Sequence, residues 1–261
     1  MTPTGTPAMD TAASADTPKV KTLTASRSPA AAYRALQYGD MPLAKAVLAE
    51  LLFFFLGSMP GAAGLWLRKK CYPCLFRSCG RGVVFGRNLI LRHPHKISLG
   101  DGVILDDGAT LDAKGATNRG ISLGDRVYIG RQSTVYTKNG DISIGDNVSV
   151  SALAILFSSN DLVLEKDTVV ASYVYILSGG EYDPADPTPY TFQTGTKTRG
   201  PLRIGEGCWI GTGAKILDAA SSIGARAIVA AGAVVVRPVP PAHVALGVPA
   251  RNRPLPPPPA S

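Results

Sequence analysis

Aromatic residues and histidine are scarce in this chain of 261 residues. Phe, Trp and Tyr together make up 7% of the sequence and histidine occurs three times, whereas glycine occurs 28 times. A composition poor in aromatic residues and rich in glycine suits short strands and tight corners better than a helical bundle. The length allows one sizeable domain with tails, or two small domains.

Cysteine is also infrequent, and its four positions are scattered: Cys71, Cys74, Cys79 and Cys208. Four cysteines at these spacings are too few for a disulfide scaffold. The pair in Cys71-Tyr-Pro-Cys74 lacks the second pair, or the histidines, that would complete a zinc site. We therefore predict buried thiols and no bound metal.

Acidic residues are absent from residues 68–96, which carry eight basic ones: Arg68, Lys69, Lys70, Arg77, Arg81, Arg87, Arg92 and Lys96. Their number equals the net charge of the whole chain, +8, so the remainder is close to neutral. A localised basic stretch attracts an anionic surface, either lipid headgroups or nucleic acid. Aromatic stacking residues do not alternate regularly with the basic ones, so we do not expect a nucleic-acid partner.

The sequence has no long uninterrupted apolar run. The strongest run, residues 46–67, contains Glu50 and is broken by Pro60, whereas a membrane-spanning helix needs about twenty apolar residues. We expect a short apolar helical hairpin that associates with an anionic membrane surface, with Arg68-Lys69-Lys70 at the headgroups. The positive-inside rule then places the protein at the cytoplasmic face of the inner membrane. The alternative is a helix pair packed on the domain's own core.

Composition divides the chain into four segments. Residues 1–41 are mainly Thr, Ala, Ser and Pro near the start, which predicts a disordered segment without a signal peptide. Residues 42–78 form the membrane-associating segment with its basic flank. Residues 79–237 carry a repeat interrupted by a long loop at 177–203, and residues 238–261 form a C-terminal extension with a Pro-rich tail.

A period of six residues runs through the repeat region. Aliphatic residues recur in trios at steps of six: Leu99, Leu105, Leu111; Leu123, Ile129, Val135; Ile144, Val150, Leu156; Leu164, Val170, Ile176; Ile204, Ile210, Ile216; and Ile223, Val229, Val235. A small or β-branched residue follows four places later, and Gly directly follows the first member in five of six trios. One large inward side chain per short strand, with Gly freeing the backbone at each corner, predicts an all-β parallel β-helix with three sides per coil.

The gaps between trios locate a functional edge. From the third member of one trio to the first of the next, the steps are 12, 9, 8, 28 and 7 residues instead of six. Every insertion therefore leaves the coil at the same corner. We expect this corner to carry the functional loops.

Two motifs at the end of the repeat resemble a known family. Residues 204–211 (Ile-Gly-Glu-Gly-Cys-Trp-Ile-Gly) and 230–235 (Ala-Ala-Gly-Ala-Val-Val), with the closing Gly-Val-Pro-Ala-Arg at 247–251, resemble the hexapeptide-repeat acyltransferases, in the maltose and polysaccharide O-acetyltransferase branch. The resemblance covers about residues 80–253. It implies a left-handed β-helix, a homotrimer and acetyl-CoA or another acyl-CoA as co-substrate. The residues it assigns to the cofactor are Trp209, Gly211, Gly232 and Arg251.

The chain departs from that family at the catalytic base. The family's histidine falls on Glu181, or on Tyr182 if the alignment follows the Gly pair before it. A carboxylate can act as general base when burial raises its pKa, so Glu181 with Asp183 is the candidate catalytic pair. His93 and His95 lie several coils earlier and are interpreted as loop residues near the headgroups. A second departure is the seven-residue step through residues 219–222, which predicts a small bulge.

The resemblance implies an O-acyltransferase that modifies a sugar or lipid-linked glycan precursor at the membrane. Two alternatives stay open: a non-catalytic trimeric β-helix scaffold, which the missing histidine favours, and an N-acetyltransferase acting on an amino sugar. Carbonic anhydrases with this fold need three zinc-binding histidines on adjacent faces, which three scattered histidines do not supply.

Overall fold

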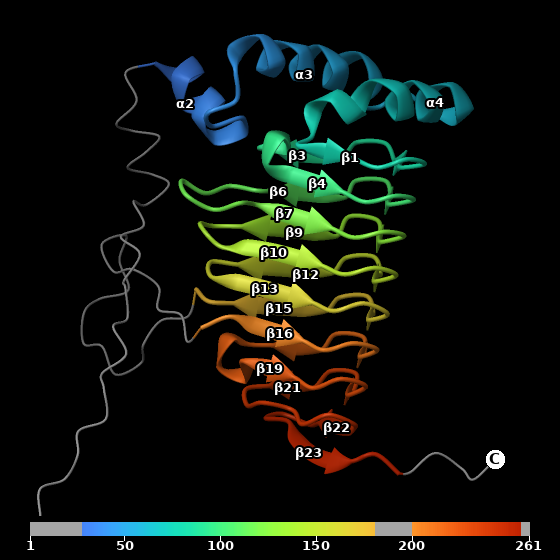
Figure 1. The fold of residues 1–261 in the computed structure, drawn as a ribbon, viewed down its shortest axis with the longest axis vertical. Helices are drawn as coiled ribbons and strands as arrows, with labels where there is room; N and C mark the ends of the chain where they lie inside the picture. The colour runs from blue at the N-terminus through green and yellow to red at the C-terminus, as the bar shows by residue number, and fades with distance from the viewer. Residues whose placement is uncertain (1–27, 181–199, 257–261) are drawn as a thin grey trace, which may run out of the picture.

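Three parallel β-sheets wind along one axis as the sides of a prism (Figure 1). The computed structural model describes residues 28–180 and 200–256. From β1 to β21 the chain enters sheets A, B and C in rotation, so each sheet pairs strands of successive coils. The all-β parallel solenoid predicted from the repeat is confirmed.

The strands are short, mostly of two to four residues. Sheet A contains β1 (Ser78–Cys79), β4 (Ile97–Leu99), β7 (Ile121–Leu123), β10 (Asp141–Ile144), β13 (Asp161–Leu164), β16 (Leu202–Ile204) and β19 (Ser222–Ile223). Sheet B contains β2 (Val84–Phe85), β5 (Ile104–Leu105), β8 (Tyr128–Ile129), β11 (Ser149–Val150), β14 (Val169–Val170), β17 (Trp209–Ile210), β20 (Ile228–Val229), β22 (His243–Leu246) and the antiparallel β23 (Arg251–Pro254). Sheet C contains β3 (Ile90–Arg92), β6 (Thr110–Asp112), β9 (Thr134–Thr137), β12 (Ile155–Ser158), β15 (Tyr175–Ser178), β18 (Lys215–Ile216) and β21 (Val234–Val235).

The strand register follows the predicted trios. Leu99 pairs with Leu123 in sheet A, and Ile129 pairs with Val150 in sheet B. All eighteen trio side chains are at most 3% exposed. Each contributes roughly 1.5–3 kcal/mol by its burial, so the prism interior is one continuous aliphatic stack.

Glycine follows every sheet A strand except β13, which Glu165 follows, and the structure gives this glycine a different reason from the one expected. A Cβ on Gly100 would lie 2.6 Å from the carbonyl carbon of Gly124 in the next coil. The left-handed backbone stands two places later, at Gly102 (φ 67°) and at Arg126 (φ 56°). The glycine directly after the strand therefore permits close approach between coils. The left-handed position two residues later also accepts a larger residue, as at Arg126.

Three α-helices lie across the end of the stack next to β1, opposite the end formed by β22 and β23 (Figure 1). They are α2 (Pro29–Gln37), α3 (Leu43–Leu56) and α4 (Gly61–Cys71), and the 3₁₀ turns are η1 (Tyr72–Leu75), η2 (Pro94–Lys96) and η3 (Asp218–Ala220). The apolar run, residues 46–67, thus belongs to two helices, α3 and α4, and residues 57–60 between them are not helical. Within the described residues, no helix is both long and apolar enough to traverse a bilayer.

Residues 28–41 differ from the disordered segment that we expected. α2 begins at Pro29, a residue that suits the first helical position, and Tyr38 and Met41 behind it are buried. The backbone N–H of His93 donates to the carbonyl oxygen of Gln37 at 3.0 Å. The expectation was wrong here because these few contacts anchor a segment whose average composition is that of a flexible chain.

Arg68 is buried rather than placed at a membrane surface. Its side chain is enclosed, and Nη1 donates to the carbonyl oxygens of Leu56 (2.9 Å) and Met59 (2.8 Å). Nε donates to the carbonyl oxygen of Phe85 in β2 at 3.0 Å. The guanidinium therefore satisfies carbonyls at the end of α3 and ties the helices to the first coil. Burial lowers the pKa of Arg68.

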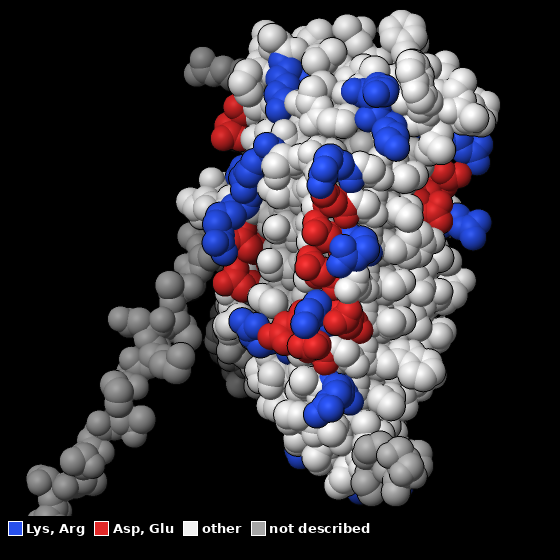
Figure 2. Space-filling model, turned by 45° about the vertical axis from the view of Figure 1, so that its right-hand side comes forward, with Lys and Arg blue, Asp and Glu red and all other residues white. Residues whose placement is uncertain are grey.

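Other basic side chains of residues 68–96 form ion pairs with the next coil. Arg81 lies 3.2 Å from Asp101, and Arg87 lies 3.0 Å from Asp107. The backbone N–H of each arginine also donates to the same aspartate. Such pairs belong to columns of charge that follow the stack (Figure 2). Much of the basic stretch is therefore structural, whereas Lys69 and Lys70 stay exposed.

Candidate functional site

The insertions of all coils meet at the corner where the chain passes from sheet C to sheet A, here called the loop edge. The segments that follow β6, β9, β12, β15 and β18 all lie there. This confirms the prediction that every insertion leaves the coil at one corner. Residues 181–199, which lie outside the described residues, join this edge between Gly180 and Gly200.

The predicted catalytic pair, Glu181 and Asp183, belongs to the segment that is not described. The structure does place the residues immediately before it. The backbone N–H of Gly179 donates to Oδ1 of Asp218 at 2.5 Å, and Ser178 donates its hydroxyl to the carbonyl oxygen of Asp161 at 2.8 Å. Ser178 and Gly179, at the start of the loop, are therefore fixed to the neighbouring coils.

Asp218 was not identified from the sequence, although the strand register already places position 218 in an inward column. Ser158 pairs with Ser178, and Ile176 pairs with Ile216. Extending the second pairing by two residues puts Asp218 in the same inward column, where its side chain is 1% exposed. A carboxylate at an inward position needs hydrogen-bond donors, and Asp218, the first residue of η3 at the predicted bulge, finds one in the backbone N–H of Gly179.

Aromatic side chains cover sheet C beside the start of the loop. The rings of Tyr136 and Phe157 lie 4.6 Å apart, and Phe157 is buried although its strand position faces outward. Burial, with a smaller effect of Tyr175, raises the pKa of Tyr136 to about 12. A Cβ on Gly180 would lie 2.8 Å from the Phe157 ring, and its φ of 84° also requires glycine. Beside the start of the loop there is thus a packed aromatic pair, in which Phe157 is buried and Tyr136 is a half-buried, neutral phenol.

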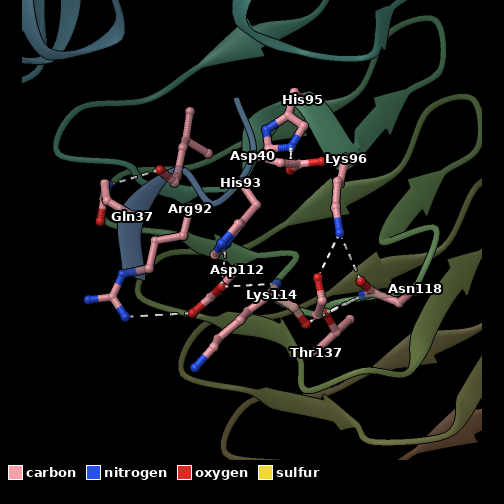
Figure 3. A network of polar contacts seen from close by, with 12 residues as sticks. Gln37, Asp40, Arg92, His93, His95, Lys96, Asp112, Lys114, Asn118 and Thr137 are labelled. Carbon is pink, nitrogen blue, oxygen red and sulfur yellow. Dashed lines mark hydrogen bonds and ion pairs between the residues drawn. The ribbon is translucent and has the colours of Figure 1, made fainter. Parts of the chain in front are cut away.

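A polar network occupies the loop edge nearer the helices (Figure 3). Arg92 lies 3.6 Å from Asp112. Lys96 donates to the carbonyl oxygen of Gly115 at 2.7 Å and to the side-chain oxygen of Asn118 at 3.3 Å. These residues come from β3, η2 and the segment after β6, so the network ties successive coils together at the edge.

Both histidines of this region are packed into the junction with α2. His93 is 3% exposed, has a left-handed backbone (φ 52°) and places Nδ1 3.5 Å from Oδ1 of Asp112. Nε2 of His95 lies 2.8 Å from Oδ1 of Asp40. Burial lowers the pKa of His95, and the hydrogen bond with Asp40 opposes this. The interpretation as loop residues near headgroups is wrong, because residues 37–41 cover both rings.

The predicted cofactor residues lie toward the far end of the prism. Trp209 is 58% exposed on the outer face of sheet B. Gly211 and Gly232 stand on adjacent coils at the corner from sheet B to sheet C, and Arg251 is exposed in β23. A Cβ on Gly211 would lie 2.6 Å from the backbone nitrogen of Ala231, whereas no atom lies within 4 Å of one on Gly232. The four residues gather on one side, away from the loop edge of the same chain.

The cysteines of the described residues are all free thiols. Burial raises the pKa of Cys79 and of Cys208, which disfavours the thiolate that a nucleophile or a metal ligand needs. Within residues 28–180 and 200–256, no group of three or more His, Cys, Asp or Glu side chains is placed to hold a metal ion.

Comparisons with known proteins identify the repeat. A family model described as the hexapeptide repeat of succinyl-transferase matches residues 120–152 and 201–237. Among curated protein sequences, none matches the chain significantly.

Solved structures of similar proteins include three kinds of transferase. AntD, an N-acyltransferase from Bacillus cereus solved with dTDP and coenzyme A, is 19% identical over 76% of this chain and 89% of its own, with a TM-score of 0.49. The polySia-specific acetyltransferase NeuO is 16% identical over 68% and 80%, with a TM-score of 0.43. Galactoside acetyltransferase in complex with coenzyme A is 16% identical over 82% and 83%, with a TM-score of 0.41.

We draw no conclusion from these three likenesses, because each TM-score is below 0.5. The family model and the observed coils agree independently of them: the two matched ranges contain complete trios whose members all point inward. The chain is thus a parallel β-helix of hexapeptide repeats, and the resemblance to the hexapeptide-repeat acyltransferases that its sequence predicts is confirmed.

Proposed function

We propose that the protein is an acyl-CoA-dependent O-acyltransferase, in the first place an acetyltransferase, acting on a sugar or a lipid-linked glycan precursor. The observation that carries the proposal is the loop edge, where the longest insertion starts beside Asp218 and the Tyr136–Phe157 pair. A binding site of this kind combines apolar walls with a few placed polar groups. The family model supports the acyltransferase class.

In this reaction the acceptor hydroxyl gives its proton to a general base as its oxygen attacks the thioester carbon of acyl-CoA. The carbon–sulfur bond then breaks, and the coenzyme A thiolate recovers the proton. Glu181 is the proposed base and Asp183 its supporting carboxylate. In the sequence Glu181 stands two residues after Gly179, whose backbone N–H is bound by Asp218.

We also propose a left-handed coil and a homotrimer. On one chain, the cofactor residues Trp209 and Gly232 lie on a different side of the prism from the loop edge. A complete site therefore needs a second chain, whose cofactor side faces the first chain's loop edge. Parallel packing of three copies around one axis would make three such sites.

Two alternatives are separated by what the protein binds and modifies. An amino-sugar N-acetyltransferase would use the same cofactor with an amine acceptor, while a scaffold would not bind acyl-CoA.

The proposed location is the cytoplasmic face of a membrane, where glycan precursors and acyl-CoA meet. Lys69 and Lys70 are exposed beside the apolar helices. Basic residues next to a membrane-associated segment favour the cytoplasmic side, which is the positive-inside rule.

Calorimetric titration with acetyl-CoA tests the proposal. We expect binding, and weaker binding by the variant Trp209→Ala. Ile104→Ala, an exposed apolar position on the same face of sheet B but nearer the helices, is the matched control and should leave affinity unchanged. Product analysis with hydroxyl and amine acceptors then distinguishes O- from N-acylation. Absence of acetyl-CoA binding would identify a scaffold instead.

A further inference from the structure

The helical end of the molecule exposes large apolar side chains to solvent. Leu43, Val47, Leu51, Phe54 and Phe55 of α3 and Trp66 of α4 are each 49–79% exposed. Soluble proteins rarely leave so many large apolar side chains exposed together unless the surface binds something. This helical surface consequently needs a partner.

The exposed residues share one face of α3. Leu43, Val47 and Leu51 recur at four-residue spacing, which places them on one side of a helix. Ala46 and Ala49, on the other side, are buried. Leu56 is also buried on that side, and Leu52 and Phe53 pack against the core. α3 is thus apolar on both sides, whereas a surface helix usually turns a polar face to solvent.

Two lysines lie at one end of this face, and α3 carries one exposed acidic residue, Glu50. Lys69 and Lys70 are exposed in the last turn of α4. Glu50, the sole acidic residue between positions 43 and 71, accepts hydrogen bonds from the hydroxyl groups of Tyr33 (2.6 Å) and Tyr38 (2.8 Å). In the view of Figure 2 the helical end is mostly white, with patches of blue and one red group at its left edge.

We propose that the outward face of α3 and α4 docks into the interfacial region of an anionic lipid bilayer without crossing it. α3 has 14 residues and is about 21 Å long, shorter than the hydrocarbon core of about 30 Å. Aromatic rings suit the boundary between headgroups and acyl chains. Lys69 and Lys70, four residues after Leu65 and Trp66, can extend to lipid phosphates.

Anionic lipid is a better partner for this face than the N-terminal segment of the same chain. Residues 1–27 contain few large apolar side chains, namely Met1, Met9, Val20 and Leu23. A second copy of the chain would bring Lys69 and Lys70 of both copies to one interface, where like charges repel. Anionic lipid complements both the apolar face and its charge.

Docking through this face fixes how the molecule stands on the membrane. The helices lie across the end of the stack (Figure 1), so the coils extend away from the lipid. Trp66 lies in the docking face, while Trp209 belongs to β17, the sixth strand of sheet B from the helical end. Five strand spacings put β17 about 24 Å from β2. The two tryptophans of the chain therefore report on opposite environments.

Tryptophan emission of two single-tryptophan variants tests the inference with the full chain. Trp209→Phe keeps Trp66, and we expect anionic phosphatidylglycerol vesicles to shift its emission to shorter wavelength and brominated lipids to quench it. Trp66→Phe keeps Trp209, whose emission should change in neither way. Binding in which Trp66 stays in water would overturn the proposal. So would a Trp66 emission that shifts with protein concentration in the absence of vesicles, because that result indicates a second copy.

Two sets of substitutions separate the apolar and the charged contributions. Phe54→Ser, Phe55→Ser and Trp66→Ser together should abolish vesicle co-sedimentation without lowering the melting temperature. The matched control replaces three exposed apolar residues of the β-helix, Ile90, Ile155 and Tyr173, by serine and should bind normally. Lys69→Gln with Lys70→Gln should weaken binding to anionic vesicles about 30-fold, from roughly 1 kcal/mol per lysine. These outcomes do not depend on acyl-CoA, so they stand or fall separately from the proposed acyl transfer.

Discussion

Asp218 accepts a hydrogen bond of 2.5 Å from the backbone N–H of Gly179, 39 positions earlier in the chain. The carboxylate is buried, and its partner is the second residue before the undescribed segment that carries Glu181. This contact connects the irregular step at η3 to the longest insertion of the β-helix. Two departures from the six-residue repeat thereby become one structural unit at the loop edge.

Asp218→Ala is expected to destabilise the protein by roughly 1–3 kcal/mol, because it leaves the Gly179 N–H without its buried acceptor. It should also lower turnover by freeing the start of the loop. Asp218→Asn keeps one acceptor oxygen and should cost less. Urea unfolding and steady-state kinetics give the two measurements. Ser158→Ala, in the same inward column, is the control and should leave turnover unchanged.

Ile129→Asp and Ile210→Asp should each unfold the coil stack, since both side chains are fully enclosed in the prism and an unpaired buried charge is very costly. Val169→Asp, an exposed position on the outer face of sheet B, should fold normally. Thermal melting followed by circular dichroism distinguishes the two classes. Melting within a degree or two of the parent would contradict the inward assignment.

The coils could be predicted in detail because the repeat is local and periodic. Each trio residue is constrained by the same inward position in every coil, so its sequence spacing directly predicts its pairing, as with Leu99 and Leu123. The insertion corner followed from the same counting. Asp218 also lies in an inward column, but it stands two residues after Ile216, the third member of its trio. Counting the trio positions alone therefore does not identify it.

The junction with the helices could not be predicted in this way. Whether Arg68 faces lipid or caps α3 depends on where the helices lie on the first coil, and no sequence periodicity specifies that position. His93 is likewise buried only because residues 37–41, more than fifty positions earlier, fold over it. Long-range contacts made once, without a repeat, leave no pattern along the chain.

The junction should depend on pH through His95. Burial lowers the pKa of this histidine, and protonation would place an N–H at Nδ1, a buried atom without a hydrogen-bond partner among the described residues. The unfolded chain, with a histidine pKa of about 6.5, therefore binds more protons, so stability rises with pH in this range. The contribution is fully present above about pH 6.5 and is lost as the pH falls toward the lower folded value.

We accordingly expect the melting temperature to fall between about pH 7.5 and about pH 5.5, with a smaller fall in the variant His95→Gln. His243→Gln is the matched control, because His243 lies in β22 at the opposite end of the stack. Differential scanning calorimetry at several pH values measures the effect. Equal pH dependence of the parent and of His95→Gln would assign it to other groups.

Catalysis by Glu181 predicts a specific pattern of kinetic effects. Glu181→Gln should preserve the fold and the affinity for acyl-CoA, since the amide is isosteric, while lowering turnover by roughly 10²–10⁴. Asp183→Asn should cost less, because a supporting carboxylate orients the base and does not accept the proton. Turnover of the parent should rise with pH through an apparent pKa above that of a free glutamate, about 4.3.

The histidine pair gives the contrasting result. His93→Ala with His95→Ala removes two rings from the α2 junction and should lower the melting temperature more than the turnover of the folded protein. If turnover instead disappears at a temperature where the double variant is folded, while Glu181→Gln remains active, the base belongs to the network around Asp112 and not to the long loop. The two variants therefore decide which part of the loop edge performs the chemistry, because loss of the base lowers turnover while stability and cofactor affinity are kept.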